Sequence, residues 1–123
     1  MSTKFATAVS CFDGRIQLPI QEWLKDTYKV DYVDTITEHG IVKLFSSPED
    51  AERIKSKVLH SIKHENSGII LVSAHHDCEG NAVTKNEQIV QVRKAVSIIE
   101  SWKLPVNVIG VWVNEQLQVE AVS

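Results

Sequence analysis

Apolar and polar residues follow two different periods along the chain, and these periods predict strands that alternate with helices. Runs of apolar or β-branched residues, most of them without charge, are typical of strands in a buried sheet. Between these runs, apolar residues recur every three or four positions, which is the period of one helix face. The predicted strands are residues 5–12, 30–37, 68–74, 106–113 and 117–122. The predicted helices are residues 18–28, 48–65 and 85–103.

Capping residues support the predicted helix boundaries. Ser47 comes before a proline and two acids, which is typical of a helix start. Thr84 is followed three residues later by Glu87, and this spacing resembles a capping box. Pro19 is acceptable in the first turn of the first helix, and Pro105 ends the last helix.

The resulting order, β-α-β-α-β-α-β-β, predicts an α/β fold: a single-domain three-layer sandwich with a mainly parallel sheet. A doubly wound sheet of this length, with right-handed crossovers, usually has the strand order 2-1-3-4. The turn at Asn114 and Glu115 predicts an antiparallel C-terminal strand. Residues 1–123 contain no repeat, linker or low-complexity segment, so we expect one domain.

Composition and charge argue against several classes of partner and cellular location. The chain has 123 residues, enough to bury a core without disulfides or a structural metal. A formal net charge of −3 argues against nucleic acid or an acidic membrane surface as the main partner. No apolar run approaches the ~20 residues that span a bilayer, and the N-terminus lacks the apolar region of a signal peptide. We therefore expect a cytoplasmic protein whose thiols stay reduced.

The only two cysteines fall at the ends of two predicted strands. Cys11 ends the first strand, whereas His75 and Cys78 follow the third. In the order 2-1-3-4 the carboxyl ends of these strands lie side by side, where ligands of open parallel sheets bind. Two thiolates and one imidazole suit a zinc ion in tetrahedral geometry. The sequence therefore predicts a zinc site, with packing of buried cysteines in the core as the alternative.

Two charged residues accompany the first cysteine. Asp13 lies two residues after Cys11, on the same side of an extended chain. Its carboxylate can complete the zinc tetrahedron, or it can hydrogen-bond a water that does. Arg15 is the nearest basic group and can hold that carboxylate in one orientation. A redox disulfide between the two cysteines is another alternative, although the chain has no Cys-x-x-Cys motif.

These residues resemble two motifs of the β-class carbonic anhydrases. Residues 11–15 resemble the family motif Cys-x-Asp-x-Arg, and residues 75–78 resemble His-x-x-Cys. Residues 108–112 also look like a strand near the family's C-terminal end, so the resemblance covers about residues 5–122.

The resemblance implies a function and a site. The implied activity is reversible hydration of carbon dioxide to bicarbonate by zinc-hydroxide attack, the reaction of a carbonate dehydratase lyase. It implies that Cys11, His75 and Cys78 bind zinc, and that Asp13 and Arg15 form the catalytic pair. It also implies a homodimer or a higher homo-oligomer.

The chain departs from the family at several points. The family's N-terminal helices are expected to be absent, because the first strand begins at Phe5. Ala74 and Glu79 stand where glycines usually flank the second motif, and Thr-Glu-His-Gly over residues 37–40 replaces the usual Arg-Asn-Ala-Gly. Two alternatives therefore stay open: a zinc enzyme for a related cumulene such as carbonyl sulfide, and a zinc-binding module without catalysis.

The roles of four further histidines each allow two interpretations. His39 and His76 can line the pocket and carry protons, or they can be ordinary loop residues. His60 and His64 lie four residues apart on a predicted helix. They can bind a metal together, or they can belong to the polar face of that helix.

Overall fold

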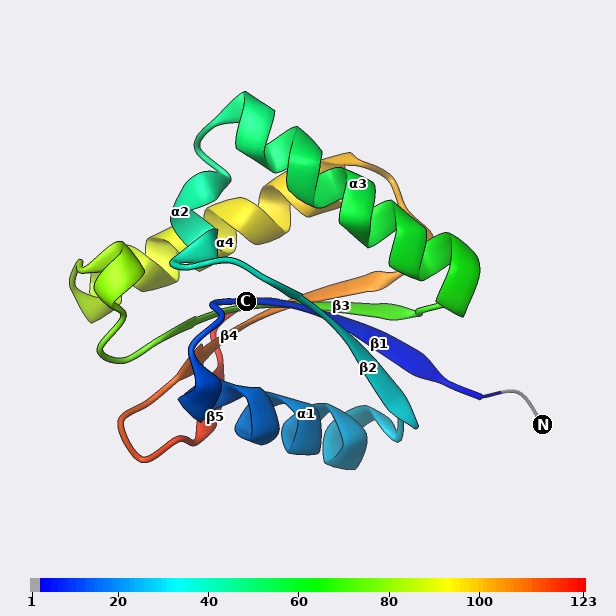
Figure 1. The fold of residues 1–123 in the computed structure, drawn as a ribbon, viewed down its shortest axis with the longest axis horizontal. Coiled ribbons are helices and arrows are strands. Elements are labelled where there is room, and N and C mark those ends of the chain that lie inside the picture. Colours follow the sequence, from blue (N-terminus) through cyan, green and yellow to red (C-terminus); the bar gives the residue numbers. More distant parts are fainter. Residues whose placement is uncertain (1–2) are drawn as a thin grey trace.

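A five-stranded sheet lies between helices on both of its faces in the computed structural model, which describes residues 3–123 (Figure 1). The strands are β1 Phe5–Ser10, β2 Tyr32–Thr37, β3 Ile69–His75, β4 Asn107–Val113 and β5 Val119–Ala121. The helices are α1 Gly14–Tyr28, α2 Ile41–Leu44, α3 Pro48–Glu65 and α4 Lys85–Ser101, with a short 3₁₀ turn, η1 Glu79–Asn81.

The strand order is β2-β1-β3-β4-β5, and this confirms the predicted α/β fold. β1 pairs in parallel with both β2 and β3, and β3 pairs in parallel with β4. β5 returns antiparallel to β4, as the turn after β4 predicts. Asn114 stabilises that turn, because its Oδ1 accepts hydrogen bonds from the backbone N–H groups of Gln116 and Gln118, both at 2.9 Å.

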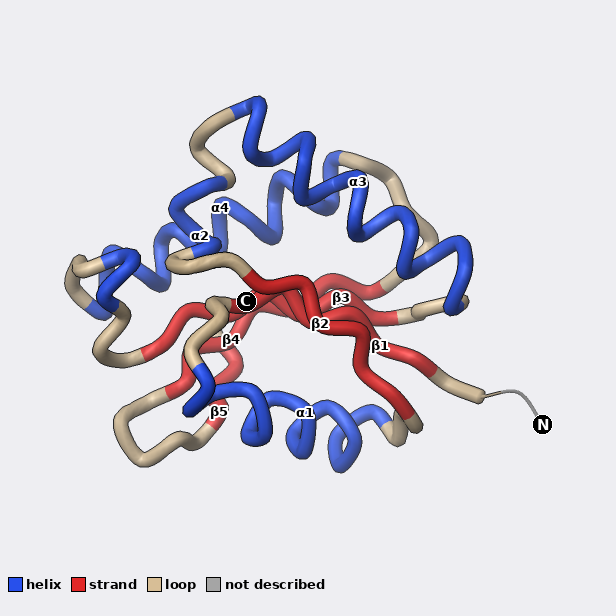
Figure 2. The backbone as a smooth tube through the Cα atoms, in the orientation of Figure 1, coloured by secondary structure: helices blue, strands red, loops and turns tan. Residues whose placement is uncertain are grey.

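Helices cover the two faces of the sheet unequally. α1 lies on one face, whereas α2, α3 and α4 lie on the other (Figures 1 and 2). Successive side chains of β1 point to opposite faces of the sheet and so enter both hydrophobic cores. Ala6 and Ala8 pack on the α1 side, and Val9 packs on the opposite side. α1 contributes Ile16, Ile20 and Leu24 to its layer. The opposite layer takes Ile54, Val58, Val92 and Ile99 from α3 and α4.

Several boundaries differ from the predicted ones. α1 begins at Gly14 and not near residue 18, because Asp13 caps it by accepting the Arg15 N–H at 2.9 Å. Pro19 therefore lies inside α1 and not in its first turn. β5 is shorter than predicted, since Leu117 adopts a left-handed conformation (φ 61°) in the turn.

Other boundaries agree with their capping residues. Ser47 accepts the Asp50 N–H at the start of α3, and Thr84 accepts the Glu87 N–H at the start of α4. α2 and η1 were not predicted, because elements of three or four residues are too short to show a period. Within residues 3–123, no helix combines the length and apolar character that a membrane crossing needs.

Candidate metal centre

The order of the strands brings Cys11, His75 and Cys78 to one place. β1 and β3 are neighbours in parallel register, so their carboxyl ends reach the same edge of the sheet. Cys11 follows β1, His75 ends β3, and Cys78 comes just before η1. All three side chains are buried, and their potential ligand atoms lie within 4.8 Å of one another. We call these three residues the Cys-His-Cys cluster.

The spacing of the two sulfurs fits a single zinc ion. The Sγ atoms of Cys11 and Cys78 are 3.9 Å apart, and both cysteines are free. With Zn–S bonds near 2.3 Å, two sulfurs on one tetrahedral zinc lie about 3.8 Å apart. The cluster therefore has the donor set and the sulfur spacing that one tetrahedral zinc ion requires.

One nitrogen of the His75 ring points into the cluster. The ring's Nδ1–H donates to the backbone carbonyl of His76 at 2.7 Å, which leaves Nε2 as the atom with the free lone pair. Nε2 is buried and has no hydrogen-bond partner among the described residues. A buried acceptor without a partner is costly, and a metal ion would satisfy it.

Burial also affects the second thiol. It raises the pKa of Cys78 to about 11, and the nearby Cys11 thiol adds to the shift. Without a metal this thiol is therefore protonated at neutral pH. A divalent cation is the partner that would reverse this preference, because thiolates are the form that binds metals.

A backbone group supports the first thiol. The N–H of Gly40 donates to Sγ of Cys11 at 3.3 Å. Gly40 has φ 62°, and a Cβ there would lie 2.5 Å from the carbonyl oxygen of Gly80, so only glycine fits. The sequence alone does not reveal this contact. The glycine after His39 is a visible signal of a turn, but its approach to Cys11 depends on the packing of distant loops.

Asp13 and Arg15 lie together at the rim of the cluster. The Arg15 guanidinium binds the Asp13 carboxylate through Nη2 at 2.7 Å and through Nε at 3.1 and 3.3 Å. These hydrogen bonds lower the pKa of Asp13 to about 2. Asp13 is not among the residues whose ligand atoms gather within 4.8 Å. The structure thus pairs Asp13 with Arg15 and leaves it outside the Cys-His-Cys cluster.

Two further side chains hold this rim in place. Arg15 also reaches the loop between His75 and Cys78, where Nη1 binds Oδ2 of Asp77 at 3.3 Å and Nη2 donates to the Asp77 carbonyl at 3.2 Å. The side-chain amide of Gln17 donates to the carbonyls of Cys11 and Asp13 at 2.8 and 2.9 Å. Neither Asp77 nor Gln17 was singled out from the sequence, because carboxylates and amides near loops are common.

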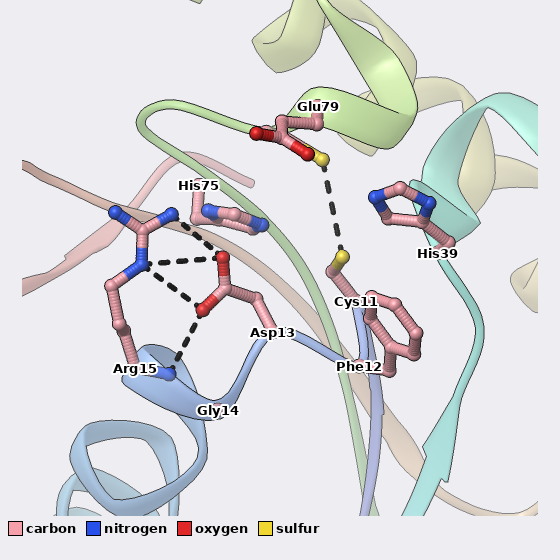
Figure 3. Close-up of a pocket in the computed structure, with 9 residues that line it drawn as sticks. Cys11, Phe12, Asp13, Gly14, Arg15, His39, His75 and Glu79 are labelled. Atoms are coloured by element: carbon pink, nitrogen blue, oxygen red, sulfur yellow. Dashed lines mark hydrogen bonds and ion pairs between the residues drawn. The ribbon is translucent and has the colours of Figure 1, made fainter.

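A cavity of about 440 Å³ opens above the cluster. Figure 3 shows Asp13 and Arg15 on one side of Cys11, and Phe12 and His39 on the other. The rings of Phe12 and His39 have centroids 4.7 Å apart, and Glu79 completes the wall. His39 therefore lines the pocket. His76 instead lies beside Glu115, with 4.0 Å between Nε2 and Oε2.

A buried polar network lies behind η1. Trp112 donates its indole N–H to Oε1 of Gln88 at 2.8 Å, and the Gln88 amide donates to the carbonyl of Asn81 at 3.3 Å. The Asn81 amide in turn donates to Gln91 at 2.6 Å. These contacts anchor η1, and with it the backbone that follows Cys78, on α4 and β4.

Comparisons with known proteins agree with this geometry. A family model described as "Putative carbonic anhydrase" matches residues 1–123. Among solved structures, a carbonic anhydrase from Glaciozyma antarctica resembles this chain with a TM-score of 0.65 at 10% sequence identity, covering 95% of this chain and 81% of that one. At this identity the likeness concerns the fold alone. No curated protein matches the chain.

Proposed function

The chain belongs to the carbonic anhydrase family whose model it matches from end to end, and on this premise we propose that it hydrates carbon dioxide reversibly to bicarbonate. In this proposal Cys11, His75 and Cys78 hold a zinc ion, Asp13 is the catalytic carboxylate and Arg15 is its positioning residue. The observation that carries the proposal is the arrangement at the rim. An ionised carboxylate, fixed by a guanidinium, lies beside a buried Cys-His-Cys cluster without joining it.

The number of protein ligands supports catalysis. Catalytic zinc sites typically have three protein ligands and keep the fourth position for water or substrate, whereas structural sites have four. When bound, zinc acts as a Lewis acid that makes water nucleophilic near neutral pH. His75 would contribute Nε2, because its Nδ1–H is already committed to the carbonyl of His76.

Asp13 has the charge and the placement to orient a nucleophile. Its pKa of about 2 keeps the carboxylate ionised at neutral pH, so it accepts hydrogen bonds and donates none. A carboxylate in this position would accept a hydrogen bond from the attacking oxygen and direct the free lone pair of that oxygen toward the carbon of carbon dioxide.

Arg15 would act through Asp13. Its Nε and Nη2 groups bind the two oxygens of the carboxylate and hold it in one orientation. The permanent positive charge of Arg15 also suits bicarbonate, the anionic product, in the same pocket. Phe12, 60% exposed, supplies an apolar wall for the neutral substrate.

The non-catalytic alternative would use Asp13 differently. A closed zinc site of four protein ligands would need the Asp13 carboxylate to leave Arg15 and enter the cluster. In the structure the carboxylate instead makes three contacts with the guanidinium. This observation favours an enzyme over a metal-storage or assembly module.

Stopped-flow hydration of carbon dioxide on zinc-loaded protein tests the proposal. We expect a rate above the uncatalysed background that rises in proportion to protein concentration. Asp13→Asn is the matched control, since it keeps the size of the side chain and the zinc ligands but removes the negative charge. A protein that holds one zinc per chain and shows no rate above background contradicts the proposal. Sulfide release from carbonyl sulfide by that protein would instead identify the related cumulene as the substrate.

A further inference from the structure

Helix α3 carries two histidines on its exposed surface that the proposed activity does not use. His60 and His64 are separated by one helical turn, and both side chains are exposed. Their rings are stacked, with centroids 4.1 Å apart and planes inclined by 27°. α3 runs from the carboxyl edge of β2 back to the start of β3, so its last turns lie at the opposite edge of the sheet from the Cys-His-Cys cluster (Figure 1).

The separation of the two rings suits a shared cation. Two imidazole nitrogens on one tetrahedral zinc, each at 2.0–2.1 Å, lie about 3.3 Å apart. Rings whose centroids are 4.1 Å apart can bring one nitrogen each to that separation by rotating the side chains alone. The backbone of a regular helix already holds the two residues on one face, so little conformational entropy is lost when both bind.

The electrostatic surroundings are mixed but permit a cation. His64 lies in the last turn of α3, where the unpaired carbonyl groups give the helix end a partial negative charge. Lys57 and Lys63 are one turn away from His60 on either side and oppose a cation. Only two protein ligands are present, so water must fill the other positions. We expect weaker binding here than at the three-ligand cluster.

We propose that His60 and His64 form a second metal site, a two-imidazole chelate for a borderline divalent cation such as Zn²⁺, on the surface of α3. This site is separate from the Cys-His-Cys cluster and does not depend on the proposed hydration activity. Imidazole is a preferred ligand of zinc, copper and nickel, and magnesium and calcium prefer oxygen. The site should therefore discriminate strongly between these two groups of ions.

The test uses the full chain already loaded with one equivalent of zinc. Further Zn²⁺ is added while calorimetry reports stoichiometry and NMR follows the ring protons of each histidine. We expect a second, weaker equivalent that shifts the signals of His60 and His64 together, and no such shift with Mg²⁺. His60→Ala and His64→Ala should each weaken the second equivalent roughly tenfold or more, because each removes the chelate.

Two further variants separate the chelate from a general surface effect. Lys63→Ala removes a charge from the same helix but keeps the pair, so it should keep the second equivalent. Ser56→His combined with His64→Ala moves the pair to residues 56 and 60, both exposed, and should restore binding. The proposal fails if binding saturates at one equivalent, or if the second equivalent survives the loss of both His60 and His64. These readouts do not involve carbon dioxide, so they stay informative even if the hydration activity is absent.

Discussion

The two halves of the candidate site are built on different physical principles. The buried half, formed by Cys11, His75 and Cys78, is 2–7% exposed and is anchored by the sheet. The rim, formed by Asp13 and Arg15, has side chains that are 21% and 53% exposed. In the buried half, the pairing of β1 with β3 brings together donor atoms that lie far apart in the sequence. In the rim, two residues of one short turn orient each other.

This contrast indicates which property each half controls. Leaving a buried polar atom without a partner costs free energy. A substitution in the cluster should therefore abolish zinc binding and not merely weaken it slightly. An exposed ion pair contributes little to the stability of the fold. Substitutions in the rim should therefore change the rate of reaction and leave the fold and the zinc content almost unchanged. The comparison would break down if substitutions in the rim removed zinc, or if substitutions in the cluster did not.

The largest effect is expected from the buried half. Cys78→Ser or His75→Ala should lower zinc affinity by more than about 100-fold and abolish hydration, because a tetrahedral site loses one of three protein ligands. Elemental analysis after dialysis against a weak chelator measures the loss. Glu79→Gln, at the neighbouring position in the pocket wall, is the control that should retain one zinc per chain. Retention of zinc by Cys78→Ser would show that this thiol is not a ligand.

Asp13→Asn should have the next largest effect, and on rate alone. We expect kcat for hydration to fall roughly 100-fold, since an amide cannot accept the same hydrogen bond with a full negative charge. Zinc content should stay at one per chain, because Asp13 lies outside the cluster. A variant that loses its zinc would place Asp13 in the coordination sphere and overturn the division between the two halves.

Arg15→Ala should lower kcat roughly tenfold while the thermal midpoint changes little. The decisive readout is the titration of the Asp13 carboxyl, followed by ¹³C NMR. Arg15 depresses the pKa of Asp13 to about 2, so its removal should let that pKa rise toward the ordinary value of 3.8. In the parent protein the ion pair therefore stabilises the fold fully above pH 3.8, and this contribution is lost as the pH falls through about 2. An unchanged pKa in the variant would separate Arg15 from Asp13.

Zinc binding should release at least one proton at neutral pH. The pKa of Cys78 is raised to about 11, so the thiol must lose its proton when it becomes a ligand. Apparent zinc affinity should then rise up to about tenfold per pH unit for each proton released. Calorimetry in buffers of different ionisation enthalpy counts the protons. Binding without proton release would mean that the buried half does not bind metal as a thiolate.

The smallest effect is expected at Asp77. The Asp77 carboxylate contacts Arg15 through one hydrogen bond at 3.3 Å, and this side chain is 66% exposed. The second contact, from Arg15 to the Asp77 backbone carbonyl, does not depend on the side chain. Asp77→Asn should change kcat by no more than about threefold and leave the thermal midpoint almost unchanged, because exposed pairs contribute little to stability. A loss as large as that in Asp13→Asn would show that the rim extends into the loop between His75 and Cys78.

Much of the fold could be predicted because its signals are local. The runs of apolar residues mark four parallel strands, and the spacing between them leaves room for the crossover helices. The strand order follows from the handedness of those crossovers. α2 and η1 escaped prediction because they are short, and the start of α1 was misplaced because the polar cap at Asp13 precedes the apolar period by several residues. A single domain, an oligomer and a cytoplasmic location remain predictions.

The residues of the candidate site could be predicted from the sequence, but some of the contacts that hold them could not. The proximity of Cys11, His75 and Cys78 could be predicted, because the ends of neighbouring parallel strands lie together and donor chemistry belongs to the residue type. The contact of Gly40 with Cys11 and that of Asp77 with Arg15 could not, since each joins loops that share no sequence pattern.

The sequence by itself determined which atoms can bind a metal and which strands carry them, because residue type and periodicity are properties of neighbouring positions. Only the tertiary structure decided how those atoms are used. It gave Nε2 of His75 the free lone pair, placed the Gly40 N–H on Cys11, and paired Asp13 with Arg15 outside the cluster. These outcomes depend on distances of a few ångströms between packed segments, and such distances follow from the fold as a whole.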